Sequence, residues 1–206
     1  MRKVLCTIAA GPHRALLEVS GPSFERYAVR HGYELVALEH NPVPQRPASW
    51  AKVALVHELA HDHDLVFWVD SDAVIVDDSV DVAGEIGWRP LHLVVHDTRD
   101  GRIPNLGVFV ARGNAPTRAL MRRLWARRAF THHRWWENAA LLDLTGHLPG
   151  GHPVRGALAP WRLAVGALDK RWNSIPADPA PAPRIVHFPG MTNEQRIAAM
   201  RVACRA

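Results

Sequence analysis

The feature that most restricts the fold of this chain is an apolar run that ends in two carboxylates. Five apolar residues, Leu65–Val69, lead directly into Asp70, Ser71 and Asp72, and three more apolar residues follow. A continuous apolar run of this length is typical of a strand that is buried on both faces of a sheet. Acidic residues at the carboxyl end of such a strand lie where open α/β sheets bind ligands. The run therefore predicts an α/β fold with a ligand site at these two acids.

Asp70 and Asp72 also restrict the chemistry of that site. A lone carboxylate is very costly to keep charged in so apolar a setting, so the pair needs a cation or strong hydrogen-bond donors. A divalent metal ion that carries a phosphorylated ligand meets this need directly. The alternative is structural, with both side chains capping the turn that follows the strand.

The first forty residues predict a β-α-β unit. Residues 4–10 predict a strand, residues 13–30 predict a helix that is interrupted near Gly21 and Pro22, and residues 33–38 predict a second strand. Two parallel strands joined in this way are connected by a right-handed crossover. The carboxyl end of the first strand then lies at the same edge of the sheet as the two acids.

Length and composition narrow the class of protein. A chain of 206 residues suits one domain, and its 48% hydrophobic and 22% charged residues are ordinary for a globular protein. The net charge of +5 comes without a zinc-finger, RRM or basic-zipper pattern, so we expect no nucleic-acid partner. No segment approaches the roughly 20 apolar residues of a membrane span, and the two cysteines provide no disulfide framework. We therefore expect a cytoplasmic protein without a membrane span.

One short motif predicts a different chemistry. Residues 57–61, with His57, Glu58 and His61, match the zinc-peptidase pattern of two histidines four residues apart with a glutamate between them. A helix would place both imidazoles on one face, as a pair of zinc ligands requires. The surrounding helix is largely apolar, however, and no third ligand follows at a familiar spacing. A zinc metallopeptidase is therefore an alternative function.

A second set of candidate metal ligands spans the chain. His187 ends a short apolar run near the C-terminus and is followed by the turn residues Pro189 and Gly190. Together with Asp70 and Asp72 it makes a set of two carboxylates and one imidazole, which leaves room for phosphate oxygens. A nitrogen ligand added to oxygen ligands shifts the preference from Mg²⁺ toward Mn²⁺.

Four segments in order resemble the motifs of GT-A glycosyltransferases, in particular the retaining α-galactosyl and α-xylosyl transferases of yeast mannan and plant xyloglucan synthesis. These segments are residues 68–73, 105–110, 137–141 and 187–190. The resemblance covers roughly residues 4–190 and implies one Rossmann-like GT-A domain over residues 1–206, with a mostly parallel central sheet flanked by helices. It places a nucleotide-sugar half at about residues 1–112 and an acceptor-side, metal-closing half at about residues 113–206.

The resemblance implies a metal-dependent hexosyltransferase. Such an enzyme moves a hexosyl group from a nucleoside-diphosphate sugar, here expected to be a UDP-sugar, to an acceptor hydroxyl. It uses Mn²⁺ or Mg²⁺, and its product keeps the configuration of the donor. By position, Asp70, Asp72 and His187 match the metal ligands, whereas Glu137 and Asn138 match the catalytic acid-amide pair near the anomeric carbon.

The resemblance also implies a set of donor-binding residues, of which the first three would line the base pocket. The matching positions are Thr7, Ile8, Ala9, Lys52, Ser71, Asn105, Gly107 and Gly190. The acceptor side is predicted from residue type instead, because aromatic faces suit the C–H surfaces of sugars. The candidates there are Trp135, Trp136 and Trp172.

Three positions depart from the pattern of these relatives. Leu106 stands where relatives commonly carry Thr or Ser, and Asn138 stands where they carry Gln. Related families place a lysine after the His-x-x-Gly turn to hold the diphosphate. In this chain Arg196 is the nearest cation after that turn.

Two rival functions would use the same nucleotide site. A nucleotidyltransferase usually shows a Gly-rich, basic phosphate loop after the first strand, which residues 10–13 do not supply. A non-catalytic module that binds a nucleotide or metabolite is the other rival, and turnover distinguishes it from an enzyme.

Overall fold

The structure is a computed structural model that describes residues 1–99, 101–147 and 161–205. In these ranges the strands are β1 (Lys3–Ile8), β2 (Glu34–Leu38), β3 (Leu65–Val69), β4 (Ala73–Ile75), β5 (Leu91–Thr98), β6 (Gly101–Arg112), β7 (Val165–Ala167) and β8 (Ile185–His187). The α-helices are α1 (Arg14–His31), α2 (Ala51–Asp62), α3 (Ala115–Trp125), α4 (Trp136–Leu144) and α5 (Asn193–Ala203).

A mixed sheet of six strands, in the order β2-β1-β3-β6-β5-β7, forms the centre of the fold. β1 runs parallel to both β2 and β3, and β5 runs parallel to β7. Only β6 is antiparallel to its neighbours, β3 and β5. The predicted α/β class with a mostly parallel sheet is therefore confirmed. The reversed direction of β6 brings its first half to the edge where β3 ends.

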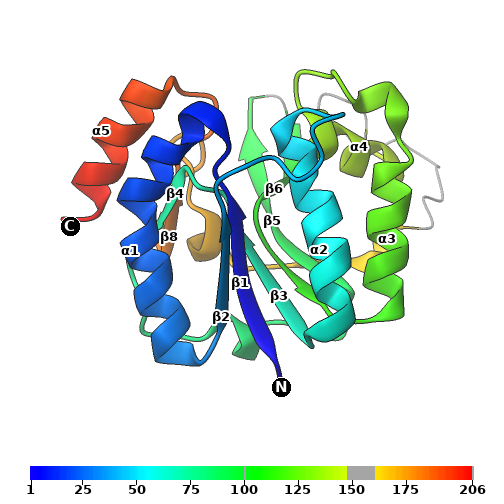
Figure 1. The fold of residues 1–206 in the computed structure, drawn as a ribbon, viewed down its shortest axis with the longest axis horizontal. Coiled ribbons are helices and arrows are strands. Elements are labelled where there is room, and N and C mark those ends of the chain that lie inside the picture. The colour runs from blue at the N-terminus through cyan, green and yellow to red at the C-terminus, as the bar shows by residue number, and fades with distance from the viewer. Residues whose placement is uncertain (100, 148–160, 206) are drawn as a thin grey trace.

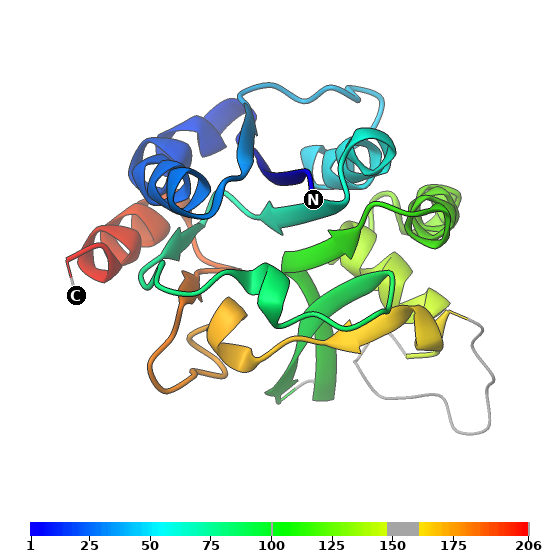
Figure 2. The ribbon, with the colours of Figure 1, turned by 90° about the horizontal axis from the view of Figure 1, so that it is seen from below.

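Helices cover both faces of this sheet, as Figures 1 and 2 show. The predicted strand at β3 is buried along its whole length, and its alternate side chains enter two different cores. Val66 and Trp68 pack in a core that includes α2, α3 and α4. Phe67 and Val69 pack in a second core that includes α1, β4 and β8. Burial on both faces explains why the sequence of β3 is apolar without alternation.

A separate two-stranded sheet brings the C-terminal part of the chain to the edge of the main sheet. β4 follows the Asp70–Asp72 turn and pairs antiparallel with β8, with Ala73 opposite His187. Helix α5 packs beside α1 (Figure 1), where Met200 is buried with Leu16 and Val74. This pairing places His187 beside the acids although it lies more than a hundred residues further along the chain.

The predicted interruption of the first helix is wrong, because α1 is continuous with Pro22 inside it. Proline in a helix interior removes one backbone hydrogen bond at a cost of about 3 kcal/mol. Packing on both sides of that position offsets this cost. Ser20 Oγ donates to the Ser71 carbonyl (3.0 Å), Ser23 Oγ accepts from the Ile75 backbone N–H (3.2 Å), and Phe24 is fully buried.

None of the helices in the described ranges combines the length and the apolar composition that crossing a bilayer requires.

Candidate active site

A cavity of about 1170 Å³ opens at the edge of the sheet where β3 ends and β6 passes. This volume is slightly larger than that of most ligand sites, which enclose roughly 300–1,000 Å³. Most of the predicted site residues line it. They are Ile8, Lys52, Asp70, Ser71, Asp72, Asn105, Gly107, Trp135, Trp136, Glu137, Asn138, His187 and Gly190.

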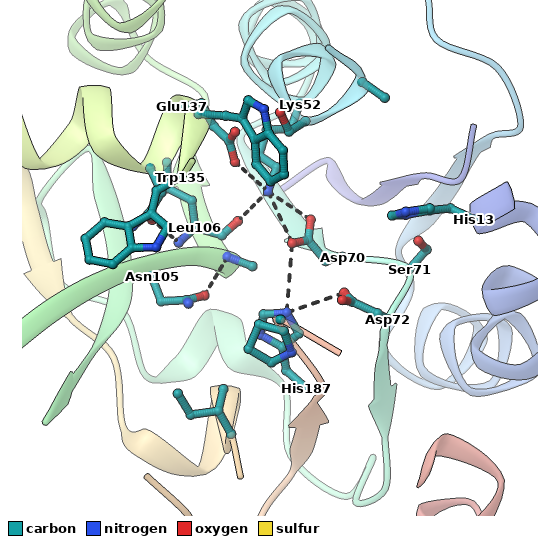
Figure 3. Close-up of a pocket in the computed structure, with 18 of the residues that line it drawn as sticks. His13, Lys52, Asp70, Ser71, Asp72, Asn105, Leu106, Trp135, Glu137 and His187 are labelled. Atoms are coloured by element: carbon teal, nitrogen blue, oxygen red, sulfur yellow. Dashed lines mark hydrogen bonds and ion pairs between the residues drawn. The ribbon is translucent and has the colours of Figure 1, made fainter. Parts of the chain in front are cut away.

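The three predicted metal ligands meet in this cavity. One ligand atom from each of Asp70, Asp72 and His187 lies within 4.8 Å of the other two. Nε2 of His187 stands 3.4 Å from Asp72 Oδ1 and 4.0 Å from Asp70 Oδ2 (Figure 3). Ligand atoms at about 2 Å from a common ion are themselves about 3 Å apart, so small shifts would let one divalent cation contact all three. The donor set of two oxygens and one nitrogen fits Mn²⁺ or Mg²⁺.

Asn173 fixes the orientation of the His187 ring. It belongs to a short 3-10 helix, η6 (Lys170–Asn173), and is fully buried. Its Oδ1 lies 2.9 Å from His187 Nδ1, and its Nδ2 donates to Asn105 Oδ1 at 3.0 Å. Because an amide oxygen only accepts, Nδ1 donates this hydrogen bond, and Nε2 is the ring nitrogen that faces the two acids. Metal-binding histidines are commonly held in this way.

Asp72 also has a permanent cationic partner. Arg196 of α5 places Nε 3.1 Å from Asp72 Oδ2, and the same nitrogen donates to the Phe188 carbonyl. Burial by itself would raise the pKa of Asp72. His187 and Arg196 outweigh that effect and hold the pKa below its usual value. The carboxylate is therefore charged and available to a metal at neutral pH.

Lys52 joins the metal-side acid to the predicted catalytic acid. Its ammonium group lies 2.9 Å from Asp70 Oδ1, 3.0 Å from Glu137 Oε1 and 3.0 Å from the Leu106 carbonyl (Figure 3). Burial disfavours the charged lysine, but the two carboxylates more than offset this and raise its pKa. An ammonium group has three donors, and all three are used by the protein. The predicted direct contact between Lys52 and the nucleotide sugar therefore stays a prediction.

Glu137 lies in the first turn of α4 with one oxygen unused. Oε1 contacts Lys52, whereas Oε2 is buried and has no hydrogen-bond partner among the described residues. Burial, helped by the nearby charge of Asp70, raises the pKa of Glu137 against the opposing effect of Lys52. Neighbouring Asn138 accepts a hydrogen bond from the Leu106 backbone N–H (3.0 Å), so its carbonyl oxygen holds β6 in place.

Comparisons with known proteins agree with this fold. A family model described as the galactosyl transferase GMA12/MNN10 family matches residues 23–103, a segment that contains β3 and both acids. A solved glycosyltransferase involved in glycosylation of the major capsid of PBCV-1 superposes with a TM-score of 0.73 at 13% identity, over 98% of this chain and 100% of that one. The chain has a GT-A glycosyltransferase fold.

Other structures with the GT-A fold are similar over nearly the whole chain. The galactosyltransferase LgtC, solved with donor and acceptor sugar analogs, gives a TM-score of 0.64 at 12% identity, over 98% of this chain and 95% of that one. The glycosyltransferase GlyE of Streptococcus pneumoniae TIGR4 gives 0.63 at 12% identity, over 100% of this chain and 61% of that one. A comparison with curated proteins gave no match.

Three of the residues predicted for the GT-A site lie elsewhere. Thr7 and Ala9 are fully buried and do not line the cavity, whereas Ile8 and Ala10 do. Alternate residues of an extended chain point to opposite sides, so only every second residue can reach the cavity. Trp172 is fully buried against Tyr27 and Phe67 and donates to Glu85 Oε2 at 2.7 Å. Its predicted place on the acceptor side is therefore wrong.

The zinc-peptidase motif lies on the outer part of α2 and away from the cavity. His57 Nδ1 contacts Glu58 at 3.2 Å, and His61 is exposed. In the described ranges, no third histidine, cysteine or acid joins these two histidines to form a metal site. The GT-A cavity is where the described ligands converge.

Gly107 makes room for the predicted metal ligand. A Cβ atom built on Gly107 would stand 2.1 Å from His187 Cε1 and 2.9 Å from Asn105 Oδ1, which no side chain tolerates. The Gly107 carbonyl also accepts from the Asp70 backbone N–H at 2.8 Å. Glycine is therefore required here by close approach of the imidazole to the strand.

We expect Gly107→Ala to displace His187 and to weaken metal binding. Overpacking at a buried site typically costs about 1–3 kcal/mol, which urea unfolding would measure. Titration with Mn²⁺ in the presence of UDP would measure the loss of affinity. Gly84→Ala is the matched control, since a Cβ atom there would meet no atom of the described residues within 4 Å. Unchanged Mn²⁺ affinity in Gly107→Ala would show that the close contact with His187 has no part in metal binding.

Proposed function

We propose that this protein is a metal-dependent glycosyltransferase that moves a hexosyl group from a UDP-sugar to an acceptor hydroxyl. The convergence of Asp70, Asp72 and His187 in the cavity of a GT-A fold is the observation that carries the proposal. The family description and the name of LgtC make galactose the first donor sugar to test. The predicted retention of configuration follows from the sequence resemblance alone.

The charges in the cavity favour a metal ion and a diphosphate together over either alone. Asp70 is already paired with Lys52, and Asp72 with Arg196. These two acids are therefore largely neutralised by the protein, and they would hold a divalent cation weakly if it bound alone. With a diphosphate present, Arg196 would have further anionic oxygens to contact, and the cation would have further oxygen ligands. When bound, the cation would stabilise the negative charge that develops on the leaving diphosphate.

Each other residue has a role that its contacts support. Lys52 holds Asp70 and Glu137 in fixed positions. The buried acid Glu137 lines the cavity and would act on the reacting sugar as base, nucleophile or charge stabiliser. Arg196 takes the place of the lysine that related families carry after the His-x-x-Gly turn. Trp135 and Trp136 line the cavity and would receive the acceptor.

The cavity draws on both predicted halves of the chain. Asp70, Asp72 and Asn105 lie within residues 1–112, whereas Glu137 and His187 lie within residues 113–206. The division into a donor half and a metal-closing half stays a prediction, and it accords with a site that only the complete domain assembles.

A thermal-shift panel of nucleoside diphosphates, with and without Mn²⁺, tests the proposal. Ligand at a hundred times its Kd stabilises a protein by about 2.7 kcal/mol, which for a chain of this length raises Tm by about 5–10 °C. We expect such a shift for UDP with Mn²⁺ and little for UDP or Mn²⁺ alone. If no nucleoside diphosphate shifts Tm in the presence of metal, the proposal fails. Binding without release of UDP from any UDP-hexose would favour the non-catalytic module instead.

A further inference from the structure

A buried histidine lines the same cavity and belongs to none of the groups described so far. His96, near the end of β5, is 1% exposed and lies in the cavity wall. Its Nδ1 is 3.2 Å from Asp178 Oδ2. Asp178 also accepts from Lys170 Nζ at 2.6 Å and from the Asp97 backbone N–H at 3.1 Å. The acid is thus held in place from three sides.

This pairing determines which atom of the His96 ring is free. The charged Asp178 carboxylate can only accept a hydrogen bond, so Nδ1 carries the proton. In the neutral ring Nε2 then has a lone pair and needs a donor. No described residue supplies one, although Nε2 is fully buried. Burial lowers the pKa of His96 despite the opposing effect of Asp178, which keeps the ring neutral. A buried acceptor without a partner is costly, so a ligand that brings a donor would bind favourably.

The order of the strands indicates which part of a nucleotide sugar lies near His96. The sheet order runs β1-β3-β6-β5, so β5 and the carboxyl end of β1 are separated by the strands that frame the metal ligands. Ile8, at the end of β1, is the predicted neighbour of the base. The diphosphate would lie over Asp70 and Asp72 at the end of β3. The part of the ligand beyond the diphosphate therefore faces β5.

The surroundings of His96 fit a sugar ring. Ile103, Ile175 and Ala177 line the cavity with it and offer aliphatic surface to C–H groups. A hexose also carries hydroxyl donors, whereas the oxygens of an ionised diphosphate can only accept. We propose that His96 Nε2 accepts a hydrogen bond from a hydroxyl of the transferred hexose, with Asp178 fixing the ring. The inference rests on the proposed function and adds a specificity-determining residue to it.

Two substitutions separate this role from a purely structural one. His96→Asn places an amide N–H near the position of Nδ1, which preserves the bond to Asp178 and removes the acceptor at Nε2. His96→Gln instead places an amide oxygen near the position of Nε2. Asp97→Asn is the control, because the Asp97 side chain is 72% exposed and its neighbour Arg102 is equally exposed. Calorimetry with Mn²⁺ would measure the affinity of each variant for UDP, UDP-glucose and UDP-galactose.

We expect His96→Asn to weaken binding of at least one UDP-hexose about tenfold and to leave binding of UDP unchanged. His96→Gln should recover part of the loss, and Asp97→Asn should match the wild type. A set of monodeoxy UDP-hexoses, each lacking one hydroxyl, identifies the group that His96 binds. The analogue that lacks the hydroxyl bound by Nε2 should bind the wild type and His96→Asn with the same reduced affinity.

If His96→Asn lost equal affinity for UDP and for UDP-hexose, the inference would be overturned and the role of His96 would be structural. Unchanged affinity for both ligands would overturn it as well, since His96 would then contact no sugar. A wild-type protein that fails to bind UDP with Mn²⁺ is a different outcome, because the result then does not depend on His96. It would refute the proposed function itself, and this inference with it.

Discussion

Asp72→Asn is expected to lower Mn²⁺-dependent release of UDP from a UDP-hexose by about 10³-fold. Removing one group that stabilises developing charge typically costs about 10²–10³ in kcat, and Asp72 also holds the metal that stabilises the diphosphate. The asparagine keeps an oxygen for His187 or Arg196 but loses the negative charge that both contact at 3.4 Å and 3.1 Å. The measurement is UDP release at saturating Mn²⁺, for wild type and variant.

The control for this variant is Asp143→Asn. Asp143 pairs with Arg127 on the surface, where both side chains are close to half exposed, and exposed pairs contribute little. Asp72→Asn also leaves Arg196 without its carboxylate, so we expect it to lose about 1–3 kcal/mol of unfolding free energy. Assays well below its melting temperature keep the two effects apart. Full activity of a folded Asp72→Asn protein would exclude Asp72 as a metal ligand.

Glu137→Gln is expected to lower kcat by about 10²–10⁴-fold without weakening the binding of UDP and Mn²⁺. Glutamine has the same shape as glutamate and can still accept from Lys52, which stands 3.0 Å from Oε1. It loses the negative charge and the second acceptor oxygen, which in the wild type is buried and has no partner among the residues that the structure describes. Single-turnover rates and UDP affinity, measured on the same preparation, would separate chemistry from binding.

Glu58→Gln is the matched control for Glu137→Gln and also tests the zinc-peptidase alternative. Glu58 is exposed on α2 between His57 and His61, belongs to no described set of three metal ligands and does not line the cavity. The activity of a glycosyltransferase should not change in this variant, whereas a peptidase that used the motif would lose its general base. If Glu137→Gln loses UDP affinity in step with turnover, Glu137 acts only by supporting Lys52 and Asp70.

The parts of the fold that the sequence predicts correctly are those with a local pattern. The run at Leu65–Val69 is apolar without alternation because its two faces enter two cores, and the polar residues after it mark the end of the strand. The sequence predicts a helix at α1 but wrongly predicts an interruption near Pro22. The contacts that offset Pro22 come from Ser71 and Ile75, about fifty residues away along the chain.

The site depends on long-range pairing that no local pattern encodes. His187 meets Asp72 because β4 and β8 pair with Ala73 opposite His187. The sequence suggested this meeting only through the residue types, the place of His187 at the end of a short apolar run, and the resemblance to known motifs. Asn173 carries no signal beyond its place next to Trp172, yet it orients the His187 ring. Trp135 and Trp172 have the same side chain, and only packing puts the first in the cavity and the second in the core.

The most direct test is diffraction from crystals grown with Mn²⁺ and UDP, with anomalous data collected at the manganese edge. We expect one anomalous peak between Asp70, Asp72 and His187, at about 2.0–2.3 Å from each ligand atom and in contact with the diphosphate. A peak at His57 and His61, or bound UDP whose diphosphate lies away from those three side chains, would contradict it.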